Sequence, residues 1–304
     1  MFPLLTTITP SDKSLFYKTL SRWRPDSKNY EDSWGYIIQA TRYDGHKWYD
    51  PTTESLIFFG RKSLTDQTLI IPNFFAEIAD LKKVLHATQS DLSSHKVILK
   101  NISNKNIKKF NDQGFRLYRD DEQWDSLARF DDQTYPQLLI DLKKILLKKG
   151  QKYRQLRRFL RKSEHATIRE YNKLDKNAVL NIFREKDSYL AKPNQQMYYQ
   201  SHAMYPDADL YKFVIIDEQI NEIIGFTAFS SITSKTAASV ASQFKPDSGA
   251  ISIWGAYQTL MQAYQKGFMQ INLGGSETKG PYNFLREKFN PIEEIKKTHL
   301  VFEI

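Results

Sequence analysis

The stretch QINLGGSETKGPYNFLREKFNP, residues 270–291, is the most informative part of this sequence for the fold. It reads as a short strand that ends in two glycines, followed by a polar turn and then by an aromatic and basic run. A glycine pair just beyond a buried strand allows positive φ and lets main-chain N–H groups approach a ligand closely. A tight turn without a ligand is the alternative, and both interpretations stay open.

Two polar segments of the second half supply candidate site residues. In the first, Glu277 suits proton transfer or orientation of an acceptor amine, and Arg286 and Lys288 suit an oxyanion or a phosphate. These three are the predicted catalytic residues. The alternative without a catalytic role is an exposed loop carboxylate beside aromatic side chains that pack into a core. The predicted substrate-binding residues are Gly274, Gly275, Ser276, Tyr282, Tyr198 and His202.

His202 and Tyr198 come from the second segment, KPNQQMYYQSHAMYPDADLY at residues 192–211. A histidine has an ordinary pKa near neutrality and therefore suits a general base, although an isolated surface histidine is more often inert. The 6 histidines show no metal-ligand spacing, so no metal site is predicted.

Apolar periodicity predicts alternating strands and helices in both halves. In the second half the order is strand, helix, antiparallel strands, helix, strand. The ranges are 166–172 for the first strand, 175–191 for a helix capped by Asp175, 211–219, 222–232 and 235–244 for strands, 252–268 for a helix closed by Gly267, and 269–275 for the last strand. In the first half we expect strands at 55–63, 67–74 and 95–102, and helices at 75–88 and 104–114.

Length and composition favour two domains of a cytoplasmic protein. The 304 residues, 40% of them hydrophobic, can fill one large core or two ordinary ones. The 0 cysteines exclude a disulfide, a thiol nucleophile and a cysteine-ligated zinc site. No apolar run is long enough to span a membrane and no signal peptide is recognisable, so we expect no integral membrane segment.

The formal charge of +9 is concentrated in KKILLKKGQKYRQLRRFLRK, residues 143–162, which contains no acidic residue. Clustered cations gain most from a polyanion, so this segment is predicted to bind phosphates, including those of tRNA. The residues expected to do so are Lys149, Lys152, Arg154, Arg157 and Arg158. A solvated helix face with an apolar underside is the structural alternative.

The helix at 252–268, the strand end LGG and the run 276–291 together resemble the last third of the catalytic domain in Fem-type peptidoglycan aminoacyltransferases. They are also similar to the C-terminal domain of phosphatidylglycerol lysyltransferases. ITPSDKSLF, EDSWGYI, IIPNF and the join LKKILLKKGQKYRQLRRFLRK resemble the first lobe and basic crossover helix of that domain. The likeness spans nearly the whole chain, and LGG and KGQKYRQLRR are its most specific parts. The Fem-type pattern tends to place a lysine directly after the phenylalanine, where this chain has Leu285.

The resemblance implies an α+β fold of two tandem GNAT-like acyltransferase lobes, each a mixed, mostly antiparallel sheet flanked by helices. It places an N-terminal lobe at 1–140, a basic crossover helix at 141–162 and a C-terminal lobe with the active site at 163–304. It also implies an acyl-group transferase that moves an aminoacyl group from aminoacyl-tRNA to an amine or hydroxyl acceptor. The implied partners are tRNA and a small-molecule or peptide acceptor.

Two other functions stay open. One is an acyl-CoA-dependent N-acetyltransferase, although SQFKPDSGAISIWGA at 242–256 lacks the glycine-rich pyrophosphate loop of such enzymes. No cofactor is therefore assigned, and acyl-CoA is kept as an alternative. The other is a non-catalytic protein that binds RNA or anionic lipid through the basic segment alone.

Overall fold

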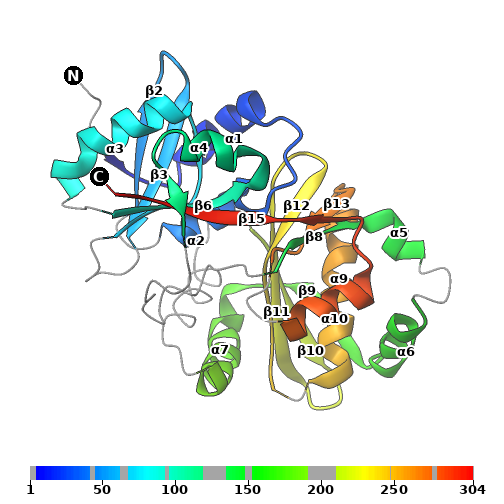
Figure 1. Cartoon of the computed structure of the whole chain (residues 1–304). Helices are drawn as coiled ribbons and strands as arrows, with labels where there is room; N and C mark the ends of the chain where they lie inside the picture. The colour runs from blue at the N-terminus through cyan, green and yellow to red at the C-terminus, as the bar shows by residue number, and fades with distance from the viewer. Residues whose placement is uncertain are drawn as a thin grey trace. The chain divides into compact units, whose positions relative to one another are not determined.

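The computed structural model of the chain describes residues 5–41, 45–61, 68–92, 96–118, 135–147, 153–190, 210–246, 248–275 and 279–303. They form two compact units (Figure 1). Unit 1 contains Met1–Ser27, Tyr36–Asp131 and Lys296–Ile304, and unit 2 contains Lys28–Gly35 and Asp132–Ile295. Each unit therefore holds a short piece from the other end of the chain. The predicted division at 140 and 162 remains a prediction, and both positions fall inside unit 2.

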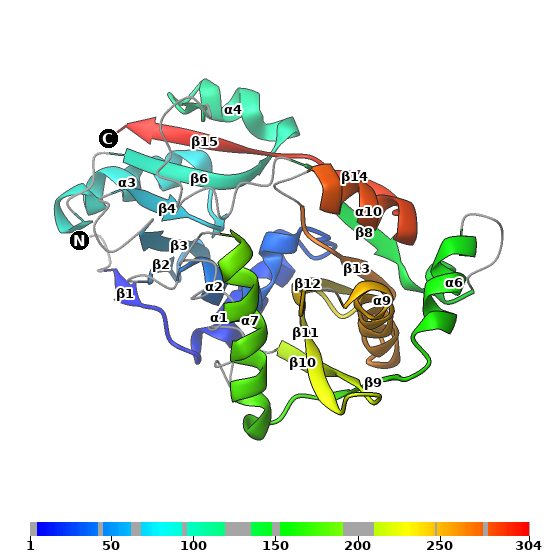
Figure 2. The same cartoon turned by 90° about the horizontal axis from the view of Figure 1, so that it is seen from below.

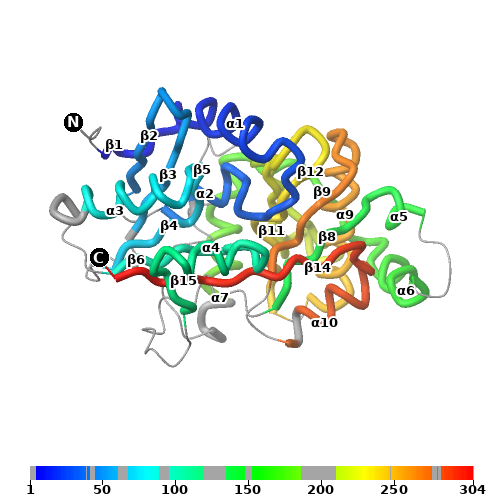
Figure 3. The backbone as a smooth tube through the Cα atoms, turned by 45° about the horizontal axis from the view of Figure 1, so that its top comes forward, coloured from blue at the N-terminus to red at the C-terminus, as the bar shows by residue number. Residues whose placement is uncertain are grey.

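Unit 1 is built on one mixed sheet. Its strands, in spatial order, are β1 (Thr6–Thr7), β2 (His46–Asp50), β3 (Ser55–Arg61), β4 (Leu69–Ile71), β6 (Lys96–Ser103), β15 (Lys297–Glu303) and β7 (Arg116–Leu117), and β5 (Phe74–Phe75) pairs with β3. Among the strands that the structure describes in this unit, β4 and β6 are the only parallel pair. The last strand of the chain, β15, lies antiparallel to β6, and Figure 3 shows the two side by side.

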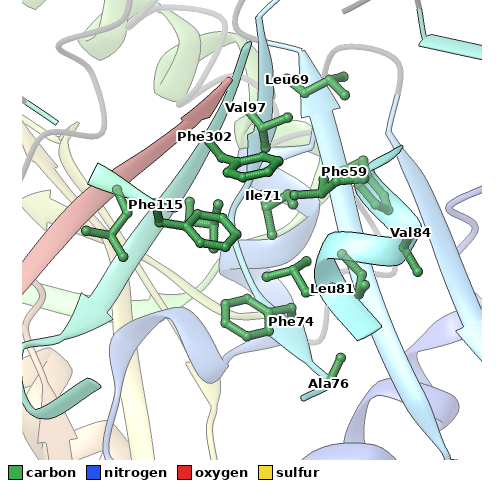
Figure 4. Close-up of a cluster of buried hydrophobic side chains, with 14 of the residues drawn as sticks. Phe59, Leu69, Ile71, Phe74, Ala76, Leu81, Val84, Val97, Phe115 and Phe302 are labelled. Carbon is green, nitrogen blue, oxygen red and sulfur yellow. The ribbon is translucent and has the colours of Figure 1, made fainter. Parts of the chain in front are cut away.

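The helices of unit 1 are α1 (Asp12–Trp23), most of α2 (Trp34–Ala40), α3 (Ile78–Leu92) and α4 (Ile107–Asn111), the last preceded by η2 (Asn104–Asn106). Its core is apolar and joins Phe302, near the C-terminus, to residues between Phe59 and Phe115, as Figure 4 shows. Phe302 of β15 lies against Phe115, with ring centroids 4.6 Å apart. Leu81 and Val84 of α3 are buried in the same cluster.

Unit 2 is built on a second mixed, mostly antiparallel sheet. Its strands, in spatial order, are β14 (Glu293–Ile295), β8 (Gln137–Asp141), β13 (Gln270–Asn272), β12 (Thr236–Phe244), β11 (Glu222–Ser231), β10 (Leu210–Asp217) and β9 (Ala166–Glu170). The pairing of β12 with β13 is parallel, and the other pairings are antiparallel. The first strand of this sheet along the chain, β8, lies between β13 and β14, which are the last two strands of unit 2 in the sequence.

Helices cover both faces of this sheet. They are α5 (Leu142–Leu147), α6 (Arg154–Lys162), α7 (Lys176–Leu190), α9 (Gly249–Gln265) and α10 (Lys279–Phe289), with the short η1 (Tyr30–Asp32) and η5 (Lys173–Asp175). Successive strand residues point to opposite faces. Phe226 of β11 meets Phe183 of α7, whereas the neighbouring Thr227 bonds Thr259 of α9. Helices α7 and α9 therefore lie on opposite faces, as Figure 2 shows.

The predicted element order of the second half is confirmed. The helix expected at 252–268 is α9, and Gly267 follows its end with φ +95°. The helix expected to start at Asp175 is α7, which begins directly after it at Lys176. The cap that the structure shows belongs to the 3-10 turn η5 before this helix, and it is Asn172. Its side chain accepts from Leu174 N, while the Asp175 carboxylate accepts from Asn172 N, and together they make a capping box before α7.

Candidate active site

The parallel pair β12 and β13 separates within unit 2. Only three residues of each strand pair, from Thr236 with Gln270 to Ala238 with Asn272. Beyond that point the chain continues to pair with β8, since Leu273 N donates to Leu138 O at 2.9 Å. Residues 239–244 of β12 therefore pair only with β11 among the described residues.

A β-bulge lies on this open part of β12. Ala228 of β11 faces Ala241, whereas the next residue, Phe229, faces Ser239, so Val240 is the extra residue. Bulges turn the strand locally and are common beside active sites. Beyond Ala238, β12 therefore has no strand partner on the side of β13 among the described residues.

Gly274 closes β13 in a conformation that requires glycine. Its φ is +74°, and a Cβ there would lie 3.3 Å from Cε2 of Tyr30. Its N–H donates to Oδ1 of Asn272 at 2.8 Å, while its carbonyl accepts from Leu138 N at 3.2 Å. The N–H and the carbonyl of Gly274 are thus both hydrogen-bonded, and the partly exposed Gly275 follows directly. Binding of substrate by this pair remains a prediction.

A short piece of the N-terminal sequence completes this region. We call residues 28–35 (KNYEDSWG) the arm, and they belong to unit 2. The arm is fixed to β13 by Asn272, whose Nδ2 donates to Lys28 O at 2.7 Å. It is fixed to β11 by Gly35, whose N–H donates to Oγ of Ser230 at 3.3 Å. It therefore spans the strands on both sides of β12.

Polar side chains of the arm and the adjoining strands are buried together. Glu31 is 3% exposed and accepts from Nε2 of Gln137 at 2.7 Å. Oε1 of Gln137 accepts from Tyr30 N at 3.2 Å and from Nδ2 of Asn272 at 2.9 Å. Gln137 and Asn272 are 1% and 0% exposed. Buried polar networks of this kind hold one geometry when their members are satisfied.

Sequence reasoning missed Glu31, Gln137 and Asn272 as site residues. Asn272 was visible as a polar residue inside the apolar strand QINL, and Gln137 as a polar residue at the start of QLLI, whereas Glu31 lies in the polar stretch YEDSW. Such residues need buried partners, and the pattern alone does not say which ones.

Arg286 and Tyr282 lie on one face of α10, four residues apart, and both contact Glu294 of β14. Arg286 Nε donates to Oε1 of Glu294 at 2.7 Å, and the Tyr282 hydroxyl donates to Oε2 at 2.7 Å. That hydrogen bond raises the pKa of Tyr282, with smaller contributions in the same direction from burial and from the carboxylate charge. Tyr282 also stacks on Tyr135, with ring centroids 5.0 Å apart.

Lys288 lies on another face of α10. Its Nζ donates to Gln155 of α6 and lies 5.8 Å from the ring centroids of Phe159 and Phe284. Arg286 and Lys288 therefore have different surroundings. Arg286 is two turns into α10, about 10 Å along the axis from Lys279. The catalytic roles of both residues remain predictions.

Several predicted site residues lie outside the described residues. They are Ser276, Glu277, Tyr198, His202, Lys149 and Lys152. Within the described ranges, no group of three His, Asp or Glu side chains is arranged to hold a metal ion. Every helix that the structure describes is too short or too polar to cross a lipid bilayer.

Helix α6 presents the predicted phosphate-binding cations. Leu156 is buried, whereas Arg154 and Arg158, four residues apart, are exposed, and Arg157 is intermediate. Residues at this spacing share one helix face. The apolar underside expected of this segment is present at Leu156, and phosphate binding by the arginines remains a prediction.

The segment 242–256, where a CoA-dependent acetyltransferase would have its pyrophosphate loop, contains two glycines with different surroundings. Gly249 opens the helix with φ +48°, and a Cβ there would meet no atom within 4 Å. Gly255 serves packing instead, because a Cβ at this position would lie 2.6 Å from Cε1 of Phe244. Gly225 of β11 meets the same ring, so Phe244 is held between two glycines.

No protein-family model and no curated protein matches this chain. Solved structures do. L-PGS from Bacillus licheniformis is 15% identical with a TM-score of 0.63, covering 96% of this chain and 92% of the other. FemX is 9% identical with a TM-score of 0.63, covering 99% and 98%. A tandem GNAT protein from the clavulanic acid biosynthesis pathway is 9% identical with a TM-score of 0.59, covering 99% and 98%.

At these identities the likeness concerns the fold. It runs over nearly the whole of each chain, and it includes both kinds of protein that the sequence resembles. The chain has a tandem GNAT-like fold, with two mixed sheets flanked by helices, as predicted from its sequence.

Proposed function

We propose that this protein is an acyl-group transferase whose active site lies in unit 2, where β12 and β13 separate. The observation that carries the proposal is the open edge of β12 beyond Ala238, with its bulge at Val240, next to the glycine end of β13. An extended ligand can hydrogen-bond to an open strand edge. The structural likeness to L-PGS, FemX and a tandem GNAT protein supports this choice of chemistry.

We propose aminoacyl-tRNA as the donor and an amine or hydroxyl of a small molecule or peptide as the acceptor. The acceptor attacks the ester carbonyl carbon, its new bond to carbon forms, and the ester C–O bond breaks. The acceptor's proton leaves to a base, and the released tRNA hydroxyl takes up a proton. No covalent enzyme intermediate is required, so the absence of cysteine is no obstacle.

The roles follow from the chemistry of each group. The main-chain N–H of Gly275 suits stabilisation of the oxyanion, since no hydrogen bond of the described residues engages it. Glu277 is the proposed base, and Arg286 or Lys288 the proposed cation for the oxyanion or the terminal phosphate. The exposed cations of α6 are the proposed contact for the tRNA backbone.

The test compares binding and transfer. Filter binding with aminoacylated tRNA, the same tRNA without its amino acid, and acetyl-CoA is measured at two salt concentrations, followed by transfer of a radiolabelled aminoacyl group to a panel of amines. We expect tighter binding of the aminoacylated tRNA and transfer that depends on the acceptor. Transfer from acetyl-CoA alone would replace the donor, and salt-sensitive binding that ignores aminoacylation, without transfer, would refute the transferase in favour of an RNA-binding protein.

A double variant, Arg154→Gln with Arg158→Gln, tests the proposed tRNA contact. Each lost phosphate contact lowers the slope of log K against log salt by about 0.9 for duplex and about 0.7 for single strands. We expect a slope lower by roughly one to two units. Lys108→Gln with Lys109→Gln on α4 removes the same charge from exposed positions of unit 1 and should leave the slope unchanged.

A further inference from the structure

The buried side chains that join the arm to β13 form a chain of hydrogen bonds with one direction. Backbone groups settle the orientation of both amides. Gly274 N–H can only donate, so Oδ1 of Asn272 is the acceptor and Nδ2 is the donor, in agreement with its 2.7 Å contact to Lys28 O. Tyr30 N–H can only donate, so Oε1 of Gln137 accepts and its Nε2 donates to Glu31.

The resulting relay runs from Gly274 N–H through Asn272 and Gln137 to the Glu31 carboxylate. Every donor points toward Glu31, over distances of 2.8, 2.9 and 2.7 Å. Hydrogen bonds in such a chain polarise one another, and a carboxylate acceptor makes the last one charge-assisted. All three side chains are at least 97% buried, so water does not compete for these bonds.

We propose that Glu31, Gln137 and Asn272 are positioning residues that set the peptide at Gly274, and through it the direction of the Gly275 N–H. This inference rests on the proposed function, because the Gly275 N–H is the proposed oxyanion donor. The main chain of Gly274 has one N–H and one carbonyl. The relay binds the N–H, and Leu138 of β8 binds the carbonyl. The arm thus acts on the reaction without touching the reacting atoms.

The relay explains why a piece of the N-terminal sequence belongs to unit 2. Strand pairing with β8 fixes where Gly274 lies, but it leaves the N–H side of that residue to side chains. Asn272 supplies that contact through its Oδ1, and its Nδ2 donates to acceptors on Gln137 of β8 and on Lys28 of the arm. Glu31 in turn accepts from Nε2 of Gln137.

Three variants separate positioning from other roles. Gln137→Met keeps the side-chain length and removes both hydrogen-bonding atoms, and Glu31→Leu removes the acceptor. Glu31→Gln keeps an oxygen that can accept from Gln137 Nε2. Gln219→Met makes the same chemical change as Gln137→Met in an exposed turn of unit 2 and is the matched control.

The measurements are steady-state transfer, thermal unfolding and amide hydrogen exchange at Gly274 in the full chain. We expect Gln137→Met and Glu31→Leu to lower kcat by about 100-fold, the effect of misplacing a group by about 1 Å, with KM nearly unchanged. Glu31→Gln and Gln219→Met should stay within about threefold of the parent, since the relay geometry is kept. Exchange at Gly274 should rise only in the two damaging variants.

Three results would overturn the inference. They are an unprotected Gly274 amide in the unmodified protein, unchanged kcat in a folded Gln137→Met variant, and equal loss in Glu31→Gln and Glu31→Leu, which would give the charge a direct role. The first needs no variant, so it decides the matter even where a variant fails to fold. Absence of transfer by the unmodified protein from every donor, with a protected Gly274 amide, refutes the proposed function instead.

Discussion

At the scale of single residues, Gly274 combines a positive φ with a close neighbour. Its φ of +74° is costly for any residue with a Cβ, by about 1–2 kcal/mol. A Cβ there would also meet Cε2 of Tyr30 at 3.3 Å. We therefore expect Gly274→Ala to lower the free energy of unfolding by about 1–3 kcal/mol, measured by urea denaturation.

Gly267→Ala is the matched control for that variant. Gly267 also has positive φ, +95°, but a Cβ there would meet nothing within 4 Å. Its substitution should cost only the backbone term, about 1–2 kcal/mol. Equal losses at the two positions would show that the Tyr30 ring yields and that the arm does not constrain the strand end.

Asp175 gives a second residue-scale prediction, because it joins the start of α7 to β9. Both of its oxygens accept from Arg169, at 2.6 and 2.7 Å, and its side chain is 6% exposed. The hydrogen bond from Arg169 is the main cause that holds the pKa of Asp175 below its usual value, and the N–H of Asn172 adds to it against the opposing effect of burial. We expect Asp175→Asn to cost about 1–3 kcal/mol at pH 7.

The sign of the pH dependence follows from that lowered pKa. A carboxyl whose pKa is lower in the folded state stabilises the protein above its unfolded pKa, about 3.9, and loses this effect as pH falls through the folded value. The difference in unfolding free energy between the parent and Asp175→Asn should therefore be constant near neutrality and shrink below about pH 4. Glu170→Gln, which removes an exposed pair with Lys266, should cost less than about 1 kcal/mol at any pH.

At the scale of elements, α9 approaches β11 through Phe244. This ring lies between Gly225 and Gly255, where an added Cβ would come within 2.6 Å of it. Gly255→Ala should overpack this contact and cost about 1–3 kcal/mol in urea denaturation. Phe244→Leu leaves more room, so the double variant should lose less than the sum of the two single losses. Strict additivity would mean that the ring does not limit the approach of the helix.

The helices and strands that the sequence predicted correctly have their signals within their own segments. Apolar spacing and punctuation by glycine or asparagine predicted α9 and the hairpin of β10 and β11, and these signals lie within the segments themselves. The positions of β8 and β15 in their sheets had no such signal. Each pairs with strands far away in the sequence, β8 with β13 and β14, and β15 with β6. Periodicity predicts a strand, but it does not say which neighbours the strand will have.

The residues of the candidate site also fall into two groups, those that a local signal predicts and those that depend on distant partners. Gly274 and Gly275 were found because glycine after an apolar strand has few explanations. Asn272 stands two residues before them and was not singled out, since its role depends on Gln137 and on a backbone carbonyl at Lys28. A buried polar residue in a strand needs hydrogen-bond partners, and the sequence pattern does not say which residues provide them.

At the scale of the whole molecule, the path of the chain makes each unit depend on both ends of the sequence. Unit 1 ends with β15, whose residues Leu300 and Val301 are fully buried. A fragment that stops at 140 would leave β6 without this neighbour, and one that begins at 163 would lack both the arm and β8. We therefore expect each end of the chain to affect the stability of a unit formed mainly by distant residues.

Phe302 tests this expectation directly. It is 7% exposed, its ring lies tilted against that of Phe115, and its ring centroid is 5.7 Å from that of His86. Phe302→Ala should cost about 3–5 kcal/mol, because it leaves a cavity in the core of unit 1. Stability is local, so the loss should appear as faster amide exchange in β6 while β11 stays protected. Glu303→Ala is the control, since this exposed neighbour forms a surface pair with Arg116 and its substitution should cost less than about 1 kcal/mol. Equal deprotection of β6 and β11 by Phe302→Ala would show instead that the two units unfold as one.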